Sequence, residues 1–590
     1  MRWEISEREA AQVQRLADEL GELKALPGVS RHKAESLRIL ASLLLRRGVS
    51  DGESAQRYLM PTLSDLHPPS KMKGLSAALD RLEAALVAKE PILIYGDYDV
   101  DGTMAVIILK AAIEICGGAA DFHVPHRIRE GYDLRDDVIE RAAAAGVRLI
   151  ISVDMGIRAF GPAETARRLG VDLIVTDHHL PGADGVPNAL AVVNPNQAGC
   201  EYPDKLLCGA GVALKLAQGL MERRVEEKDR ERMLRSFMKV AAIATVADAV
   251  PLRGENRVFA KLGLEALRRA VNPGLKALLE VAQISPRRAP TSAEIAFRIA
   301  PRINAAGRMD VAGDVIELFS VKDAARAREL AVKLDKLNSE RQEEERRILR
   351  ELFDRLAAEP ALAEAYCIVV DGEGWHRGVI GIAATRVVER YNRPAVVIAR
   401  DGEEAFGSGR SIRPFHLLEA IEASGPLFTR YGGHSHACGF AMPSANIAAL
   451  REQLDQFARA RLTQADFEPV LQIEEELDLG DVTPEFFQAL SLLEPYGTGN
   501  HEPVFAARGV RLMAPPRIMK EKHVKLKVCE EKRHKSIQAL GWNMADQVAQ
   551  ENLLAGDPLD IAFTVTHNDH PEFGGLELGL KDLRGLAHSS

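Results

Sequence analysis

Several features that mark other protein classes are scarce in this sequence of 590 residues. Aromatic residues make up only 5% of it, and the six cysteines form no Cys-x-x-Cys pair. That cysteine pattern supports neither a disulfide framework nor a structural zinc site. No apolar run is long enough to span a bilayer, and the first residues lack the apolar core of a signal peptide. These absences predict a cytoplasmic protein with reduced thiols and no membrane partner.

Positive charge is also in deficit, since the formal net charge is −9. This balance argues against a basic coat that would bind nucleic acid over the whole surface. It leaves room for a local basic groove, and one stretch is rich in cations: Lys520, Lys522, Lys525, Lys527, Lys532, Arg533 and Lys535. Alternation in residues 523–528 places Lys525 and Lys527 on one face of a strand. That face is either simply solvated or tracks a nucleic-acid backbone, and the sequence leaves both readings open.

Acidic and histidine clusters are the most informative feature that is present. They are GDYDVDG at 96–102, SVDMG at 152–156, TDHH at 176–179 and ATVAD at 244–248. The first three directly follow apolar runs of the kind that form strands. In a parallel α/β sheet, the carboxyl ends of strands meet in the crevice where ligands bind. We therefore expect these clusters to converge.

The residue types in these clusters indicate the chemistry. Carboxylates with a few imidazoles and no thiolates suit Mg²⁺ or Mn²⁺. Two such ions held about 3.5–4 Å apart stabilise the attacking and leaving oxygens of a phosphate ester. Each cluster alone could be a turn, a helix cap or a polar loop. Their recurrence favours a dinuclear metal site, because several carboxylates buried together without a cation are unfavourable.

The pattern along the chain predicts a multidomain α/β protein. Strands and helices alternate after an N-terminal helical region, and this alternation predicts a mostly parallel sheet. A proline-free, highly charged segment predicts a long connecting helix, and a second α/β unit and a small β-barrel follow it. The expected boundaries are 1–75, 76–325, 326–358, 359–465 and 466–590.

The second α/β unit carries a candidate anion site. Gly-rich turns that open helices bind phosphate well, and Gly378, Gly381, Gly432 and Gly433 are read as such turns. Tight packing would explain the same glycines. Neighbouring cationic side chains favour the anion reading, because guanidinium groups grip phosphate through two hydrogen bonds. In the barrel, Trp542, His523 and Phe563 could stack on bases, although core packing explains Trp542 and Phe563 equally well.

Taken together in order, GDYDVDGT, VDMGI, VTDHH, ADAVPL, PRINAAGRM, GGHSHACGF and LLEPYGTGN resemble the DHH-family phosphoesterases. Within that family, the chain is similar to the bacterial single-stranded-DNA exonucleases. The resemblance implies a DHH domain, a connecting helix, a DHH-associated domain and a C-terminal OB-fold barrel.

The resemblance also implies roles for individual residues. The implied metal ligands are Asp99, Asp101, Asp154, His178 and Asp248, with Asp154 bridging two ions and Asp97 as a further candidate. Asp177 would orient the neighbouring imidazole, and His179 would face the scissile phosphate. The implied substrate-binding residues are Arg302, Asn304, Arg308, Arg410, Gly432, Gly433 and His434.

The activity that this resemblance implies is Mn²⁺- or Mg²⁺-dependent degradation of single-stranded DNA from the 5′ end to mononucleotides, in repair and recombination. A helicase and a single-strand-binding protein are candidate partners, and a monomer is expected. Two alternatives stay open. One is a phosphodiesterase for short oligonucleotides or cyclic dinucleotides, and the other is a non-catalytic replication scaffold.

Overall fold

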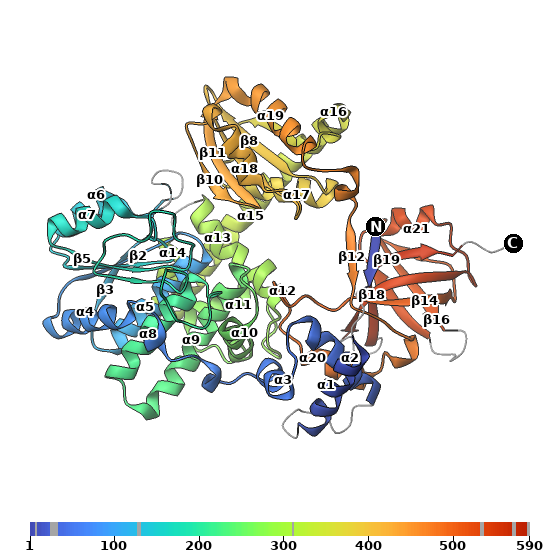
Figure 1. Ribbon diagram of the computed structural model, residues 1–590, viewed down its shortest axis with the longest axis horizontal. Coiled ribbons are helices and arrows are strands. Elements are labelled where there is room, and N and C mark those ends of the chain that lie inside the picture. The colour runs from blue at the N-terminus through green and yellow to red at the C-terminus, as the bar shows by residue number, and fades with distance from the viewer. Residues whose placement is uncertain are drawn as a thin grey trace.

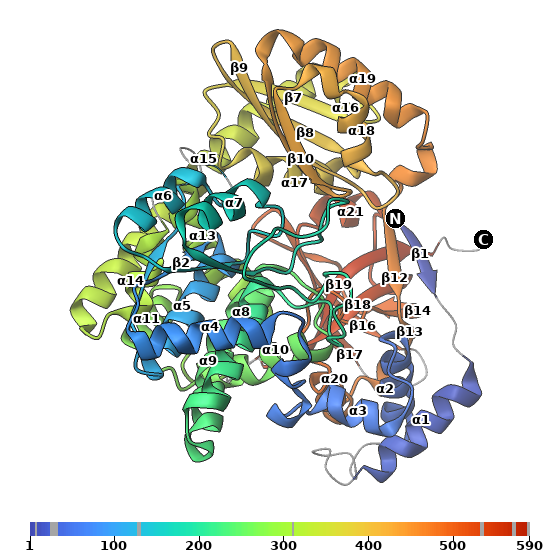
Figure 2. The same ribbon diagram turned by 60° about the vertical axis from the view of Figure 1, so that its left-hand side comes forward.

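The computed structural model describes residues 1–5, 9–23, 34–126, 131, 133–309, 312–530, 536–568 and 574–586. The lobes of the chain are an α/β unit, a second α/β unit, a C-terminal barrel and an N-terminal group of helices (Figure 1, Figure 2). Lys532, Arg533, His534 and Lys535 from the cationic stretch lie outside the described residues. Within these residues, no helix has both the length and the apolar character needed to cross a bilayer.

A five-stranded parallel sheet forms the centre of the first α/β unit. Its strands are β2 (Ile92–Gly96), β3 (Ala120–His123), β4 (Leu149–Val153), β5 (Asp172–Thr176) and β6 (Ala191–Val193). Their order is β3-β2-β4-β5-β6, so the chain direction across the sheet reverses between β2 and β4. Such a switch point leaves a crevice beyond the carboxyl ends of the two strands. The three strands expected before the acidic and histidine clusters are present as β2, β4 and β5, and β3 is a strand that the sequence pattern did not predict.

Helices cover both faces of this sheet, which is why β2 and β4 consist entirely of buried residues (Figure 1). One face packs against α4 (Leu75–Ala88), α5 (Val100–Ile115) and α8 (Gly209–Arg224). The other packs against α6 (Asp136–Ala144) and α7 (Phe160–Leu169). The two faces therefore form separate apolar cores.

The rest of the first unit is helical. It contains α9 (Glu227–Ala247), α10 (Gly254–Leu267), α11 (Pro273–Val281), α12 (Ser292–Glu294), a π-helical turn (Ile295–Ile299), α13 (Ala300–Met309) and α14 (Gly313–Ser320). The predicted connecting helix is α15 (Ala324–Ala358), which runs for 35 residues. Its first half packs in the core of the first unit through Leu330 and Leu334. Its second half packs in the core of the second unit through Ile348 and Leu352, so one helix joins the two units.

The second α/β unit contains a mixed sheet. Its strands, in the order β10-β11-β9-β8-β7, are β7 (Ile368–Glu373), β8 (Ala395–Asp401), β9 (Glu404–Arg410), β10 (Arg430–His434) and β11 (Ala437–Pro443). The helices α17 (Ile380–Tyr391), α18 (Leu417–Ala423) and α19 (Ile447–Arg459) pack with it. Only β7 and β8 are parallel neighbours.

One prediction for this unit is wrong. Gly432 and Gly433 do not open a helix, because they lie in the exposed strand β10 and pair with β11. The backbone of Gly433 has φ 149°, and a Cβ there would lie 2.3 Å from the carbonyl oxygen of Ala437. Gly433 therefore permits a tight strand pairing, whereas a Cβ at Gly432 would meet open space. Gly378 precedes α17 and Gly381 lies in its first turn, so these two glycines are at the start of a helix, as expected.

The C-terminal region forms the predicted barrel. Its strands are β13 (Glu475–Glu476), β14 (Phe505–Leu512), β15 (Arg517–Met519), β16 (His523–Cys529), β17 (Ser536–Gly541), β18 (Pro558–Asn568) and β19 (Gly575–Gly585). Pairing of β14 with both β18 and β16 closes the barrel. Phe563 is fully buried in its core, whereas Trp542 is 65% exposed and packs against His523. Core packing thus explains Phe563 but not Trp542.

The N-terminal region packs onto this barrel. Its helices α1 (Ala10–Glu22), α2 (Ala34–Arg46) and α3 (Gly52–Leu59) share one apolar core with α20 (Pro484–Ser491) and the barrel strands. A short strand, β1 (Arg2–Ile5), pairs in parallel with β12 (Val470–Ile473). The sequence pattern predicted only helices here, and β1 is therefore a strand that it missed.

Candidate metal centre

The acids of the first cluster lie in the loop between β2 and α5. Asp99 is the N-cap of α5, and its Oδ1 accepts a hydrogen bond from Gly102 N at 3.0 Å. Asp101 lies in the first turn of that helix and is 2% exposed. A Cβ at Gly102 would lie 2.6 Å from the carbonyl oxygen of Asp97, so only glycine fits there. The tight Asp-x-Asp-x-Asp-Gly turn thus places three aspartates close together at the carboxyl end of β2.

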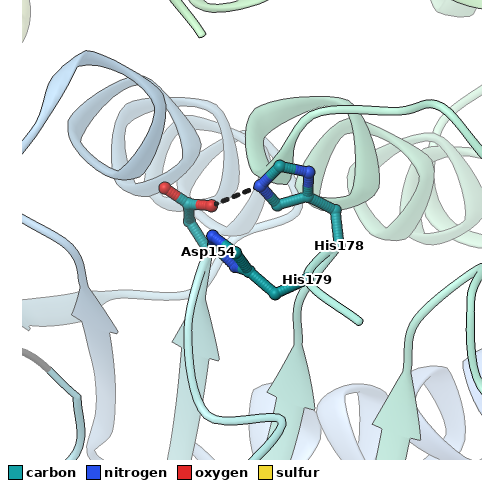
Figure 3. A group of neighbouring side chains, drawn as sticks. All are labelled: Asp154, His178 and His179. Carbon is teal, nitrogen blue, oxygen red and sulfur yellow. Dashed lines mark ion pairs between the residues drawn. The ribbon is translucent and has the colours of Figure 1, made fainter. Parts of the chain in front are cut away.

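Asp154 follows β4, on the other side of the switch point. Its backbone has φ 63°, a conformation that aspartate tolerates better than most residues. Its Oδ1 is buried and lies 3.2 Å from Nε2 of His178, yet no hydrogen bond from the described residues satisfies it. Figure 3 shows Asp154, His178 and His179 facing one another above the ends of neighbouring strands. A buried oxygen without a donor is the environment that a cation would complete.

His178 brings the other clusters together. Its Nε2 lies 3.8 Å from Oδ2 of Asp101 and 3.9 Å from Oδ2 of Asp248. Asp248 is the C-cap of α9, so it reaches the site from a helix end and not from a strand. All four sequence clusters therefore converge.

The electrostatics of these carboxylates are unfavourable in the absence of cations. Burial, followed by repulsion from the neighbouring acids, raises the pKa of Asp154 well above its usual range. The same causes, burial first and then Asp101, raise the pKa of Asp99, and they raise that of Asp248 to about 9. Burial lowers the pKa of His178, which favours the neutral imidazole that binds metals. Divalent cations would relieve the repulsion and keep the acids ionised.

Three groups of side chains are close enough to hold ions. They are Asp97, Asp99 and Asp154; Asp101, His178 and Asp248; and Asp154, His178 and His179. Within each group the potential ligand atoms lie within 4.8 Å of one another. Asp154 and His178 each belong to two groups, but only the carboxylate of Asp154 has two oxygens with which it could bridge two ions. The oxygen-rich donor set fits Mg²⁺ or Mn²⁺.

Asp177 takes part in the site without joining any of these groups. Its Oδ1 accepts hydrogen bonds from the backbone N–H groups of His178 and His179 and lies 2.7 Å from Nδ1 of His179. Burial, the largest single cause, opposes protonation of His179, but the hydrogen bond to Asp177 and the negative charges of Asp177, Asp248 and Asp101 together outweigh it and raise the pKa of His179 to about 9. The expected orienting role of Asp177 matches these contacts, with His179 as the imidazole that it holds. The geometry also admits His179 as a metal ligand.

Sequence reasoning missed the start of α8. The backbone N–H groups of Gly209 and Ala210 donate to the two carboxylate oxygens of Asp101 at 2.6 and 2.8 Å. A Cβ at Gly209 would lie 2.3 Å from Oδ1 of Asp154, so this position must be glycine. The small residues of CGAGVA at 208–213 were the available signal.

Two asparagines after β6 were also missed. Nδ2 of Asn196 donates to the carbonyl oxygen of His178 at 2.7 Å, and Nδ2 of Asn194 donates to that of His179 at 2.9 Å. They fix the backbone of the histidine pair. Their position just after a strand end, like that of the acids, was the signal in the sequence.

The predicted substrate residues of α13 make structural contacts. Oδ1 of Asn304 accepts from Val100 N at 3.2 Å, which anchors the acidic loop. Nη2 of Arg302 lies 2.8 Å from Asp335 of α15, and Nη1 of Arg308 donates to the carbonyl oxygen of Gly378 at 2.7 Å. Arg302 and Arg308 thus brace α13 against the connecting helix and the second unit. Their contact with a phosphate stays a prediction.

Arg410 of β9 and His434 of β10 both lie opposite Ala437 of β11 in the sheet of the second unit. Burial, then the charges of His436, Arg410 and His179, lowers the pKa of His434. Nη1 of Arg410 donates to Gly409 O at 2.7 Å and to Ser408 Oγ at 3.2 Å. The lowered pKa favours the neutral imidazole of His434, and contact of Arg410 and His434 with a phosphate stays a prediction.

Known proteins match this chain over nearly its whole length. Residues 91–245 match the DHH family, N-terminal domain; residues 363–460 match the DHHA1 domain; and residues 473–582 match the RecJ OB domain. The single-stranded-DNA-specific exonuclease RecJ of Bacillus subtilis is 34% identical over 99% of this chain and 70% of its own length. That of Escherichia coli is 32% identical over 88% of this chain and 90% of its own length.

Solved structures of RecJ also match this chain. The crystal structure of Thermus thermophilus RecJ in complex with Mn²⁺ has a TM-score of 0.82 and 30% identity, covering 99% of this chain and 79% of that one. The Mg²⁺ complex of the same protein has a TM-score of 0.76. The resemblance and the fold predicted from the sequence are therefore confirmed. The chain belongs to the RecJ family of DHH single-stranded-DNA-specific exonucleases.

Proposed function

We propose that this chain is a single-stranded-DNA-specific exonuclease that hydrolyses phosphodiester bonds from the 5′ end and releases mononucleotides, in DNA repair and recombination. The observation that carries the proposal is the buried position of Asp154, whose oxygen lacks a donor from the described residues and which belongs to two potential ion-binding groups. Its relatives are named for this activity and their structures hold Mn²⁺ or Mg²⁺.

Two divalent cations would be held by Asp97, Asp99, Asp101, Asp154, His178 and Asp248. When bound, such ions acidify a water and stabilise the charge that develops on the phosphoryl oxygens. The rest of the site positions the ligands. Gly209 and Ala210 hold Asp101 in place through their N–H groups, and Asn304 holds the loop that carries Asp99. Because the ligands are pre-oriented, little reorganisation is needed on binding.

The scissile phosphate would contact His179. Its ring is fixed by Asp177, and its side chain is 48% exposed, so it can hydrogen-bond a phosphate oxygen. Arg410 and His434 would hold the strand from the second unit, because a guanidinium group binds phosphate in a bidentate way. This arrangement supports entry of the chain end between the two units.

The alternative substrates are short oligonucleotides or cyclic dinucleotides. The RecJ OB domain favours a longer strand, because an enzyme for dinucleotides needs no additional strand-binding barrel. The complete set of acids argues against the non-catalytic scaffold. A cytoplasmic location, a monomer, and a helicase and single-strand-binding protein as partners stay predictions.

The test is digestion of end-labelled single strands with Mn²⁺, comparing the chain with Asp154→Ala. We expect 5′-mononucleotides from the unmodified chain, no product from D154A, and protection by a phosphorothioate block at the 5′ end but not at the 3′ end. Asp184→Ala is the matched control, because Asp184 is an exposed acid of the same region outside the ion-binding groups. Metal-dependent hydrolysis by D154A at the normal rate would remove the central assignment. Faster cleavage of dinucleotides than of long strands would favour the alternative substrates.

A further inference from the structure

Asn256 lies in the first turn of α10 and is fully buried, outside the potential ion-binding groups. Its Nδ2 donates to the carbonyl oxygen of Leu206 at 2.6 Å and to that of Pro251 at 3.1 Å. Its Oδ1 is buried and has no hydrogen-bond partner among the described residues, which lowers stability. The presence of an amide here is therefore explained by the two segments that Nδ2 holds together.

One of these segments is the loop that leads from Asp204 into α8. Oδ1 of Asp204 accepts from Leu206 N at 3.0 Å, and its Oδ2 accepts from Glu255 N at 2.8 Å. The loop is thus held against the start of α10 by both Asp204 and Asn256. A few residues later, the first N–H groups of α8 bind the carboxylate of Asp101. These contacts therefore fix the place from which Asp101 is held.

The other segment is the turn that follows the metal-ligand candidate Asp248. Ala249 in this turn has φ 56°, a conformation that is uncommon outside glycine. Residues in such conformations persist only where the surrounding contacts fix them. The bond from Asn256 supplies one such contact, and the backbone bond from Leu252 N to Thr498 O at 2.8 Å supplies another. Asn256 thus helps to fix where the chain leaves Asp248.

Both segments lead to the same candidate ion site. Asp101 and Asp248 form one potential ion-binding group together with His178. The helices α8, α9 and α10, at whose ends these segments lie, are side by side in both views (Figure 1, Figure 2). One amide at the start of α10 therefore holds the chain beside two members of this group.

We infer that Asn256 is a positioning residue for the cation that Asp101, His178 and Asp248 would bind. It acts through the two backbone segments and not by contact with the ion. This inference rests on the proposed function, which supplies the centre of two cations. The other cation should be affected much less, because the acidic loop that would bind it is anchored by Asn304. Loss of the amide should therefore weaken the binding of one ion and spare the other.

The test is a calorimetric titration of the metal-free chain with Mn²⁺, comparing the unmodified chain with Asn256→Leu. Leucine has the branched shape of asparagine but no hydrogen-bond donor. We expect the unmodified chain to bind two ions, and N256L to bind one of them as before and the other about 10–100-fold more weakly. Electron paramagnetic resonance should then show a coupled Mn²⁺ pair in the unmodified chain and a magnetically isolated ion in N256L.

Asn338→Leu is the matched control, because Asn338 is also buried and its side chain accepts from Arg341 within α15. N338L should bind both ions like the unmodified chain. Asp204→Asn is a second variant, because it replaces the oxygen that accepts from Glu255 N by a donor. D204N should weaken the same ion by a smaller factor, and it decides the question if N256L does not fold.

Binding and digestion separate this inference from the proposed function. If the unmodified chain binds Mn²⁺ but does not digest single strands, the proposed function fails, and the calorimetric comparison still decides the role of Asn256. Unchanged binding of both ions by N256L would overturn the inference. An equal loss of both ions, or a loss of the same size in N338L, would also overturn it, since either result indicates a general loss of packing. Binding of a single ion by the unmodified chain would overturn both the inference and the centre of two cations.

Discussion

Gly209→Ala is the sharpest test of how the metal centre is built. The new Cβ would lie 2.3 Å from Oδ1 and 2.5 Å from Cβ of Asp154, whereas such contacts are essentially never shorter than 3.0 Å. The carboxylate or the start of α8 must therefore move by at least about 0.7 Å, the difference between those distances. Gly209 opens a helix without a positive φ, so alanine brings no backbone strain of its own.

The expected size of the effect follows from that displacement. Ligand positions must be kept within about 0.5 Å for efficient catalysis, and disturbing a residue that supports a ligand typically costs 10–100-fold in metal affinity or activity. We expect the Mn²⁺ concentration for half-maximal activity to rise by about that factor in G209A, equivalent to ~1.4–2.7 kcal/mol. The measurement is a Mn²⁺ titration of single-strand digestion, with binding of Mn²⁺ followed by calorimetry.

Gly161→Ala is the matched control, because Gly161 also lies in the first turn of a helix and has open space around its Cβ position. It should titrate like the unmodified chain. An unchanged Mn²⁺ dependence of G209A, with the same helix content and thermal midpoint, would refute the steric reasoning.

Two further predictions concern stability. Removing divalent cations with EDTA should lower the thermal midpoint, because the crowded acids lose their counter-ions. Adding Mn²⁺ at 100 times its Kd should restore about 2.7 kcal/mol of the free energy of unfolding. Calorimetric scans measure this, and an equal response of the D154A midpoint to EDTA and Mn²⁺ would contradict the prediction. Lys261 has a pKa lowered by burial to about 7 in the folded chain, against about 10.5 when unfolded. The unfolded state therefore binds more protons between these values, and the free energy of unfolding should rise with pH from about 7 to 10 by up to ~1.4 kcal/mol per pH unit. Urea denaturation between pH 7 and 10 should show this rise in the free energy of unfolding for the unmodified chain but not for Lys261→Met. If the free energy of unfolding changed with pH in the same way in both proteins, Lys261 would not be its cause.

The acids of the metal centre could be predicted from the sequence because each follows a short local pattern that can be recognised without the structure. Asp154 and His178 follow strands whose apolar composition is visible in the sequence, and the carboxyl ends of parallel strands necessarily meet. The backbone groups that hold these acids in place could not be predicted in this way. Whether the N–H groups of Gly209 and Ala210 point at Asp101 depends on how α8 packs against α5, which no local periodicity encodes.

The same limit explains the fold features that were missed. β1 pairs with a strand more than 460 residues later, and a four-residue segment carries no sign of so distant a partner. Gly432 and Gly433 could be read as a helix-opening turn or as a close strand pairing, because glycine is compatible with both. Only the register with β11 decides between them.

The shared core of the N-terminal helices and the barrel has a consequence for biosynthesis. Leu16, Leu20 and Leu40 are synthesised hundreds of residues before the barrel residues that share their apolar core, such as Phe505 and Leu559. Until then these leucines lack part of their partner surface, and such exposed apolar surface promotes aggregation. This shared core can thus mature only after the barrel has been synthesised, whereas the first α/β unit, whose partners are closer in sequence, can fold before that. Nascent chains stalled before residue 470 should therefore protect the parallel sheet from proteolysis and leave the first helices open to it.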